Sequence, residues 1–246
     1  LEFRRVLFRS GFAVIIGGVG ADTITKGEGD AVILGDNGLM VTNTEAARSD
    51  VHILRVETTT PSIGGDDIIT TIGAGDDIII GGVGGDTINA GQGDNIVMGG
   101  GALITGRDVY PTVMQQIQIT LDTITAVAPD QDGDDTITTG LGRDIVQGGA
   151  GRDTIITNDG TGTDQSDLVI GDHATMRFDI VDGAEIPLEI TSTDVLNGDG
   201  DTITTGAGTD IIIGGSADDT IDAGADNDLI FGDYATITGN IRVQDL

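Results

Sequence analysis

The sequence predicts an all-β fold, a parallel β-roll or β-solenoid of nonapeptide repeats with inserted β-hairpin-like arms. Three observations predict it: aliphatic positions recur every nine residues, glycines and aspartates precede them, and only 3% of the residues are aromatic. A core built from one aliphatic side chain per short strand needs no large aromatic residues, and so regular a period indicates stacked coils. The 41 glycines follow no three-residue period and accompany only 4 prolines, which excludes collagen.

The nine-residue spacing organises the chain into four runs. Its aliphatic positions are Ile15, Ile24 and Ile33, then Ile79, Ile88 and Val97, then Ile137, Val146 and Ile155, then Ile203, Ile212, Ile221 and Ile230. The stretches "GGVGADTIT", "GGVGGDTIN" and "GGAGRDTII" fit the template G-G-x-G-x-D-x-U-x at every constrained position. One nonapeptide suits one short strand plus one tight turn, so two of them make a coil with a sheet on either side.

A longer period lies above the short one. The equivalent aspartates Asp22, Asp86, Asp153 and Asp219 are 64, 67 and 66 residues apart. Repeat blocks at residues 11–38, 64–101, 132–174 and 198–235 therefore alternate with arms at residues 39–63, 102–131, 175–197 and 236–246. We expect the chain to be part of a longer array, because the last arm stops within its first strand.

The arms carry a hairpin pattern, most clearly in "ATMRFDIVDGAEIPLEITST". Apolar and polar residues alternate on both sides of the turn residues "DGAE", as expected for two antiparallel strands. The first ten residues, "LEFRRVLFRS", differ from all others and are expected to be a cloning scar or translated sequencing adapter, the alternative being a short native linker. We therefore leave residues 1–10 out of the fold prediction.

Within each "D-x-U-x" the aspartate and the aliphatic residue share one strand parity. Both are expected to point inward, and the residues between them to face solvent. Outward threonines recur in this pattern, which raises an ice-binding alternative. We discount it, because the arms are expected to interrupt each ladder after about two coils and Ile78, Ile80, Asn89 and Asp222 break the threonine ranks.

The turn chemistry points to a cation. Glycines supply the positive φ of tight turns, and aspartates in equivalent turns stack about 4.8 Å apart. At an effective dielectric near 20, each such pair of like charges repels by roughly 3 kcal/mol, so the coil is not expected to close without a counter-ion. Calcium suits an irregular all-oxygen site better than magnesium. The candidate ligand residues are Asp22, Asp67, Asp77, Asp86, Asn95, Asp135, Asp144, Asp153, Asp167, Asp201, Asp210, Asp219 and Asp228, with the turn glycines Gly18, Gly20, Gly82, Gly84, Gly149 and Gly151.

These nonapeptides resemble the RTX, or haemolysin-type, calcium-binding repeats of secreted bacterial proteins. The resemblance implies several calcium ions, each between successive turns on one side of the roll. The implied pairs are Asp67 with Asp86, Asp135 with Asp153, Asp201 with Asp219, Asp144 with Asp167, Asp210 with Asp228, and Asp77 with Asn95. Ala13 and Ala31 replace the expected aspartate, which weakens the sites around the first block. The alternative is a metal-free solenoid whose aspartates bond only to their own turns.

Composition argues against several other functions. A net charge of −30 is unfavourable for binding nucleic acid or an anionic membrane surface, and no apolar run is long enough for membrane insertion. His52 and His173 have no second histidine or cysteine at metal-ligand spacing, and no catalytic serine motif occurs. We therefore predict no enzymatic activity in this segment.

Two functions remain in competition. The first is a non-catalytic structural segment of a large extracellular or cell-surface adhesin-like protein, which binds calcium, other units of the array or a cell-surface ligand. The second is the calcium-dependent folding and type I secretion module of a secreted enzyme, a protease or lipase with its catalytic domain elsewhere.

Overall fold

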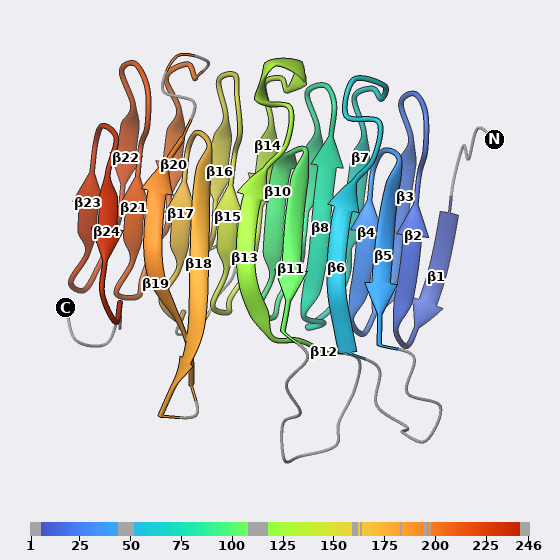
Figure 1. The fold of residues 1–246 in the computed structure, drawn as a ribbon, viewed down its shortest axis with the longest axis horizontal. Helices are drawn as coiled ribbons and strands as arrows, with labels where there is room; N and C mark the ends of the chain where they lie inside the picture. The colour runs from blue at the N-terminus through green and yellow to red at the C-terminus, as the bar shows by residue number, and fades with distance from the viewer. Residues whose placement is uncertain are drawn as a thin grey trace.

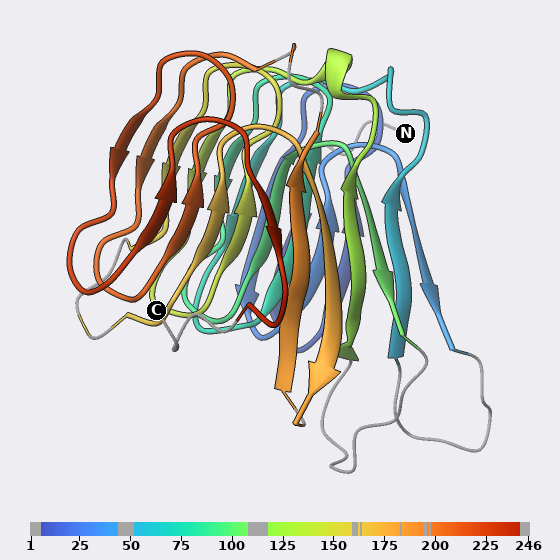
Figure 2. The same ribbon diagram turned by 60° about the vertical axis from the view of Figure 1, so that its left-hand side comes forward.

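The computed structural model describes residues 6–43, 52–107, 118–158, 162, 164–182, 184–193, 196 and 198–241. Within these residues the strands form three eight-stranded sheets, which we call sheets A, B and C. Their strands run across the long axis of the molecule, and each sheet extends along this axis as one layer (Figure 1, Figure 2). The all-β fold with a parallel β-roll is therefore confirmed.

Sheets A and B are the two parallel walls of the roll. Sheet A contains β1 (Val6–Ser10), β3 (Thr23–Glu28), β7 (Ile68–Thr71), β9 (Thr87–Asn89), β14 (Thr136–Thr138), β16 (Thr154–Ile156), β20 (Thr202–Thr204) and β22 (Thr220–Asp222). Sheet B contains β2 (Ala13–Ile16), β4 (Ala31–Leu34), β8 (Asp77–Gly82), β10 (Ile96–Gly100), β15 (Ile145–Gln147), β17 (Leu168–Ile170), β21 (Ile211–Ile213) and β23 (Leu229–Phe231). The chain alternates between the two walls, so each coil contributes one strand to each.

The inner core of the roll consists of the predicted aliphatic positions. Ile24, Ile69, Ile88, Ile137, Ile155 and Ile203 from sheet A face Ile33, Ile79, Val97, Val146, Val169 and Ile212 from sheet B. Parallel pairing keeps them in register: Ile88 pairs with Ile137, and Val97 with Val146. The nine-residue period thus produces two facing aliphatic ranks, one from each wall.

The arms fold into sheet C, which is antiparallel apart from the short β12. Its strands are β5 (Gly38–Thr42), β6 (His52–Thr58), β11 (Ala102–Gly106), β12 (Gln118–Ile119), β13 (Leu121–Ala126), β18 (Ala174–Val181), β19 (Ala184–Ser192) and β24 (Thr236–Thr238). The third arm forms the predicted hairpin, β18 with β19, and β5–β6 and β11–β13 pair in the same way. Neighbouring hairpins also pair with each other through β6–β11 and β13–β18. A short 3₁₀ helix, η1 (Pro129–Gln131), leads from the second arm back to the roll.

Sheet C packs on the outer face of sheet B and creates a second core. Sheet B contributes Val32, Leu34, Ile78, Ile80, Met98, Ile170, Ile211 and Ile213, and sheet C contributes Ile53, Val56, Ile104, Ile124, Met176, Phe178 and Ile190. The prediction that outward residues face solvent is therefore wrong for sheet B. It missed this layer because it treated all coil strands alike, although continuous apolar runs such as "DIIIGG" are typical of strands buried on both faces.

The outer face of sheet A carries the outward threonines. Thr136 pairs with Thr87 on one side and Thr154 on the other, although an arm separates Thr87 from Thr136 in the sequence. The expectation that arms interrupt these ranks is wrong. The arms begin and end at the turns, so the strands before and after an arm pair directly with each other. Ile78 and Ile80 lie in sheet B and do not break the ranks, whereas Asn89 and Asp222 do lie in sheet A.

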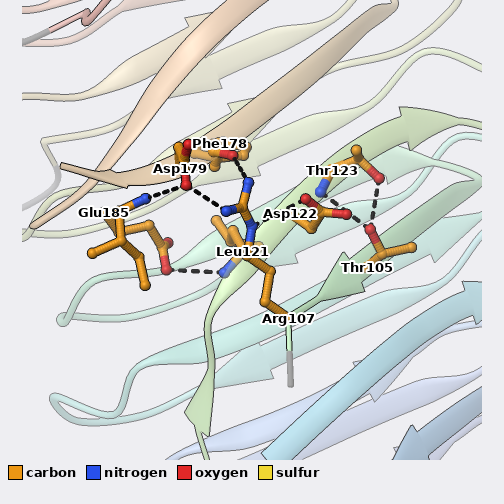
Figure 3. A network of polar contacts seen from close by, with 9 residues as sticks. Thr105, Arg107, Leu121, Asp122, Thr123, Phe178, Asp179 and Glu185 are labelled. Carbon is orange, nitrogen blue, oxygen red and sulfur yellow. Dashed lines mark hydrogen bonds and ion pairs between the residues drawn. The ribbon is translucent and has the colours of Figure 1, made fainter. Parts of the chain in front are cut away.

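Hydrogen bonds and an ion pair join the second and third arms within sheet C (Figure 3). Arg107 follows β11; its Nε donates to Asp122 at 3.1 Å, and its terminal nitrogens reach Asp179 and the carbonyl of Phe178. The Glu185 carboxylate accepts the backbone N–H of Leu121 at 2.9 Å. These contacts tie the separate hairpins into one layer.

Val6–Ser10, within the ten residues left out of the fold prediction, form β1 and pair in parallel with β3. In the part of the chain that the structure describes, no helix is long and apolar enough to cross a membrane.

Candidate metal centres in the turns

The turns that lead from sheet B to sheet A lie along the upper edge in Figure 1 and carry one continuous column of aspartates. In this upper column, one carboxylate oxygen, Oδ1, accepts the backbone N–H of the column residue in the preceding coil, at 2.6 to 2.9 Å. Its members, in stacking order, are Asp22, Asp67, Asp86, Asp135, Asp153, Asp201 and Asp219.

A lower column follows the turns that lead from sheet A to sheet B. Its members are Asp77, Asn95, Asp144, Asp167, Asp210 and Asp228, and the same type of bond joins them at 2.8 to 3.1 Å. Asn95 takes part through its amide oxygen, so the replacement of the acid preserves this bond. Ala13 and Ala31 occupy the first positions, where Ala31 pairs with Asp77 in the strand register.

The structure brings together every pair that the sequence analysis proposed. It also joins Asp22 to Asp67, Asp86 to Asp135 and Asp153 to Asp201, which the arms separate in the sequence. The bonds run to a neighbouring coil, whereas the metal-free alternative expected bonds within the same turn. Whether these residues ligate calcium stays a prediction.

The second carboxylate oxygen of most column residues is buried without a hydrogen-bond partner. Among the described residues this holds for Oδ2 of Asp67, Asp86, Asp135, Asp153, Asp201, Asp210 and Asp219. Burying an unpaired charged oxygen is costly, so a cation or a proton is needed at these positions. The donor chemistry is therefore that of a site for a hard cation.

Glycine makes room for these oxygens. A Cβ on Gly81 would lie 2.2 Å from Oδ2 of Asp86 and 2.4 Å from the carbonyl oxygen of Gly99 in the next coil. The same arrangement of one carboxylate oxygen and one carbonyl oxygen surrounds Gly35, Gly99, Gly148, Gly171 and Gly214. The space that a side chain would fill is thus lined by oxygen from two coils, which fits calcium.

Side-chain carboxylates alone do not complete these sites. The described ranges contain no group of three or more histidine, aspartate or glutamate side chains arranged to hold a metal ion. Backbone carbonyls must therefore supply a large share of the ligands. The turn glycines predicted from the sequence suit this role because their φ values lie between 92° and 131°. They are Gly18, Gly20, Gly82, Gly84, Gly149 and Gly151.

Burial raises the pKa of several column carboxyls far above the ordinary 3.8. The pKa rises to about 9 for Asp86, Asp153 and Asp167, and to about 8 for Asp201. Loss of hydration is the largest cause in each, and the charges of neighbouring aspartates add to it. Without a cation, these turns hold their carboxyls in an environment that opposes the charged form.

Three buried aspartates outside the predicted set lie where arms join the roll. Asp36 Oδ2 accepts the N–H of Val83 at 2.6 Å, Asp132 Oδ2 accepts that of Ala150 at 3.1 Å, and Asp172 Oδ2 accepts the Ser216 hydroxyl at 2.5 Å. Each therefore reaches the next coil, Asp36 and Asp172 where the chain leaves the roll and Asp132 where it returns from the second arm. For Asp36 and Asp172 the signal was present in "GDNG" and "GDHA", where an aspartate replaces the second turn glycine.

Comparison with known proteins adds one finding. The family profile described as RTX calcium-binding nonapeptide repeat (4 copies) matches residues 71–102, 131–164 and 195–230. These ranges include most members of both columns and begin after the first block. No curated protein sequence matches the chain significantly.

Proposed function

Because the chain carries RTX calcium-binding nonapeptide repeats, we propose that it is a non-catalytic, calcium-locked structural segment of a large extracellular or cell-surface adhesin-like protein. Such repeats imply calcium binding, and proteins that contain them are typically secreted. The finer role, a stiff spacer that presents or separates adhesive parts, is the proposal.

The observation that carries it is the continuity of both columns through the arms. A spacer must keep one direction over many units, and a stack whose turns, walls and arm sheet all pair without interruption does so. The arms add a layer on one wall, and contacts with a surface or a glycan would be made there. The columns themselves are too buried to contact a macromolecular partner.

Calcium, when bound, supplies positive charge that offsets the repulsion between stacked carboxylates. Oδ2 of residues such as Asp86 and Asp153, together with carbonyl oxygens of the turn glycines, would hold it. The Oδ1 atoms already bridge successive coils, so they set the distance between turns. Binding would thus complete a preformed oxygen arrangement and stabilise the folded chain.

A calcium titration of the full chain tests the proposal. Starting from chelator, far-UV circular dichroism is expected to report a cooperative transition to β-sheet with a midpoint in the millimolar range or below. Magnesium at equal concentration is the control and is expected to fail, since it prefers rigid octahedral sites. Sheet content that is identical in chelator and in calcium would overturn the proposal.

The second candidate, a folding and secretion module of a secreted enzyme, draws on the raised carboxyl pKa values. Raised pKa values disfavour the folded chain where calcium is scarce. A polypeptide that is exported unfolded requires this before it leaves the cell. The parent gene discriminates between the two functions. A catalytic motif beside the array supports the enzyme, and further units of about 66 residues support the spacer.

A further inference from the structure

The lower turn between β3 and β4 departs from all later lower turns at two positions. Ala31 stands where the lower column has an acid or amide, and Lys26 stands five residues before it. In two later turns a threonine precedes the column acid and bonds to it: Thr139 donates to Asp144 Oδ2 at 2.6 Å. Thr157 donates in the same way to Asp167. The turn between β3 and β4 thus has lysine and alanine where these later turns have threonine and aspartate.

The strand register shows that these positions are equivalent. Lys26 pairs with Thr71 between β3 and β7, and Ala31 pairs with Asp77 between β4 and β8. The Thr71 hydroxyl donates to the carbonyl oxygen of Ala90 at 2.5 Å, and Thr71 also acts to lower the pKa of Asp77. Lys26 and Ala31 therefore exchange a hydroxyl and a carboxylate for an ammonium and a methyl group at one location in the coil.

Lys26 points into the roll and is fully buried, with 0% exposure. Its Nζ donates to three carbonyl oxygens of its own turn, those of Gly27 at 2.8 Å, Glu28 at 2.7 Å and Gly29 at 3.1 Å. An ammonium has three donors, and here each meets an oxygen. A lysine is almost never fully buried unless its charge is matched, so this set of oxygens is a built site for a positive charge.

A negative charge lies in the next coil. Lys26 lowers the pKa of Asp77, although burial outweighs this effect and leaves the pKa raised to about 7. The ammonium thus contacts carbonyl oxygens of its own turn, and its charge acts on the acid of the following turn. Carbonyls of one turn and a carboxylate of a neighbour are also the oxygen types that the later turns offer.

We propose that the ammonium of Lys26 takes the cation position of the lower turn between β3 and β4, which therefore closes without a metal ion. This inference rests on the proposed function, because it requires that the later turns bind calcium. The coil of β3 and β4 then provides a calcium-independent template on which the later, calcium-dependent coils stack. The cation of this coil is part of the chain itself. Because Ala31 replaces the column acid, no second column carboxylate lies beside the ammonium.

Exchange of the two residue pairs tests the inference by the number of bound calcium ions, measured by equilibrium dialysis on the full chain. The variant K26T/A31D restores the later pattern and is expected to bind one more ion than the unaltered chain. The reciprocal variant T139K/D144A is expected to bind one fewer. Thr138→Lys is the matched control, since it adds the same charge on the outer face next to Thr139 and is expected to leave the number unchanged.

Hydrogen exchange supplies a local reading in the same proteins. In Lys26→Met, amides of residues 24–34 are expected to lose protection at saturating calcium, while those of residues 203–213 keep theirs and serve as the internal reference. In K26T/A31D, protection of residues 24–34 is expected to depend on calcium. Full protection in Lys26→Met would overturn the inference.

The outcomes separate this inference from the function on which it rests. If the unaltered chain binds no calcium, both fail. If it binds calcium but the two exchange variants leave the number of ions unchanged, only the role assigned to Lys26 fails.

Discussion

Sheets A and B come from the same nonapeptide, yet their outer faces have opposite character. In sheet A the residues beside the inward aliphatic are mostly threonines and face solvent, as Thr202 does. In sheet B the equivalent residues are aliphatic and lie under the arm sheet, as Ile211 does at 0% exposure. The inner faces of the two walls are alike.

One nonapeptide therefore determines two separate properties of the strand that it forms. Its constrained positions build the turn and the inner core, while its unconstrained positions decide whether a wall faces water or another layer. The arms can cover only the wall whose outer face is apolar, and in this chain that wall is sheet B.

The largest predicted effect is that of pH on the stability of the fold, and it arises in the turns, which both walls share. A carboxyl whose pKa is raised in the folded state contributes stability below its unfolded pKa of 3.8 and loses it as the pH rises through the folded value. With folded values of about 7 to 9 for several column residues, sheet content in chelator is expected to increase as the pH falls from 9 to 5. Circular dichroism measures this change.

Saturating calcium is expected to abolish or reverse that dependence, because protonation removes the ligands. Sheet content in chelator that rises with pH would contradict the assignment of buried, uncompensated carboxyls to the columns.

A charge on the outer faces tests the comparison directly. Ile211→Asp places an unpaired carboxylate between sheets B and C and is expected to cost about 4 kcal/mol or more of the free energy of unfolding. Thr202→Asp, at the equivalent place nine residues earlier, is expected to cost about 0.5 kcal/mol or less. Urea unfolding in saturating calcium compares the two, and equal losses would mean that sheet C does not cover sheet B in solution.

The inner faces should give the smallest difference between the walls. Ile203→Ala in sheet A and Ile212→Ala in sheet B each truncate a side chain with 0% exposure, and each is expected to cost about 2 to 5 kcal/mol. The two losses are expected to agree within about 1 kcal/mol, because both residues lie in the same core. A large loss for only one of them would show that the walls are unequal inside as well as outside.

The sequence predicted what depends on the short period. Positions such as Ile88 and Val97, the positive φ of Gly82 and Gly84, and the stacking of Asp67 on Asp86 follow from one nonapeptide and the geometry of a parallel sheet. Pairs across an arm, such as Asp86 with Asp135, were missed because nothing in the period says that a chain returns to the same register after a long insertion.

The arm layer and the exceptional turns depend on side chains that the period does not constrain. The run "DIIIGG" could have indicated a wall buried on both faces, but identifying its cover requires pairing between separate arms. Asp36 and Lys26 break the repeat at single positions. Departures of this kind gain meaning only once the register shows which residues they replace.

The stacking bonds of the upper column span alternately short and long stretches of chain, which sets an order of assembly. Asp67 and Asp86 are 19 residues apart, whereas Asp86 and Asp135 are 49 apart, and the same alternation continues to Asp219. Closing the longer loop costs about 1 kcal/mol more in chain entropy. Coils within a block should therefore nucleate first and blocks join afterwards, so that an array of any length propagates in steps of one block and one arm.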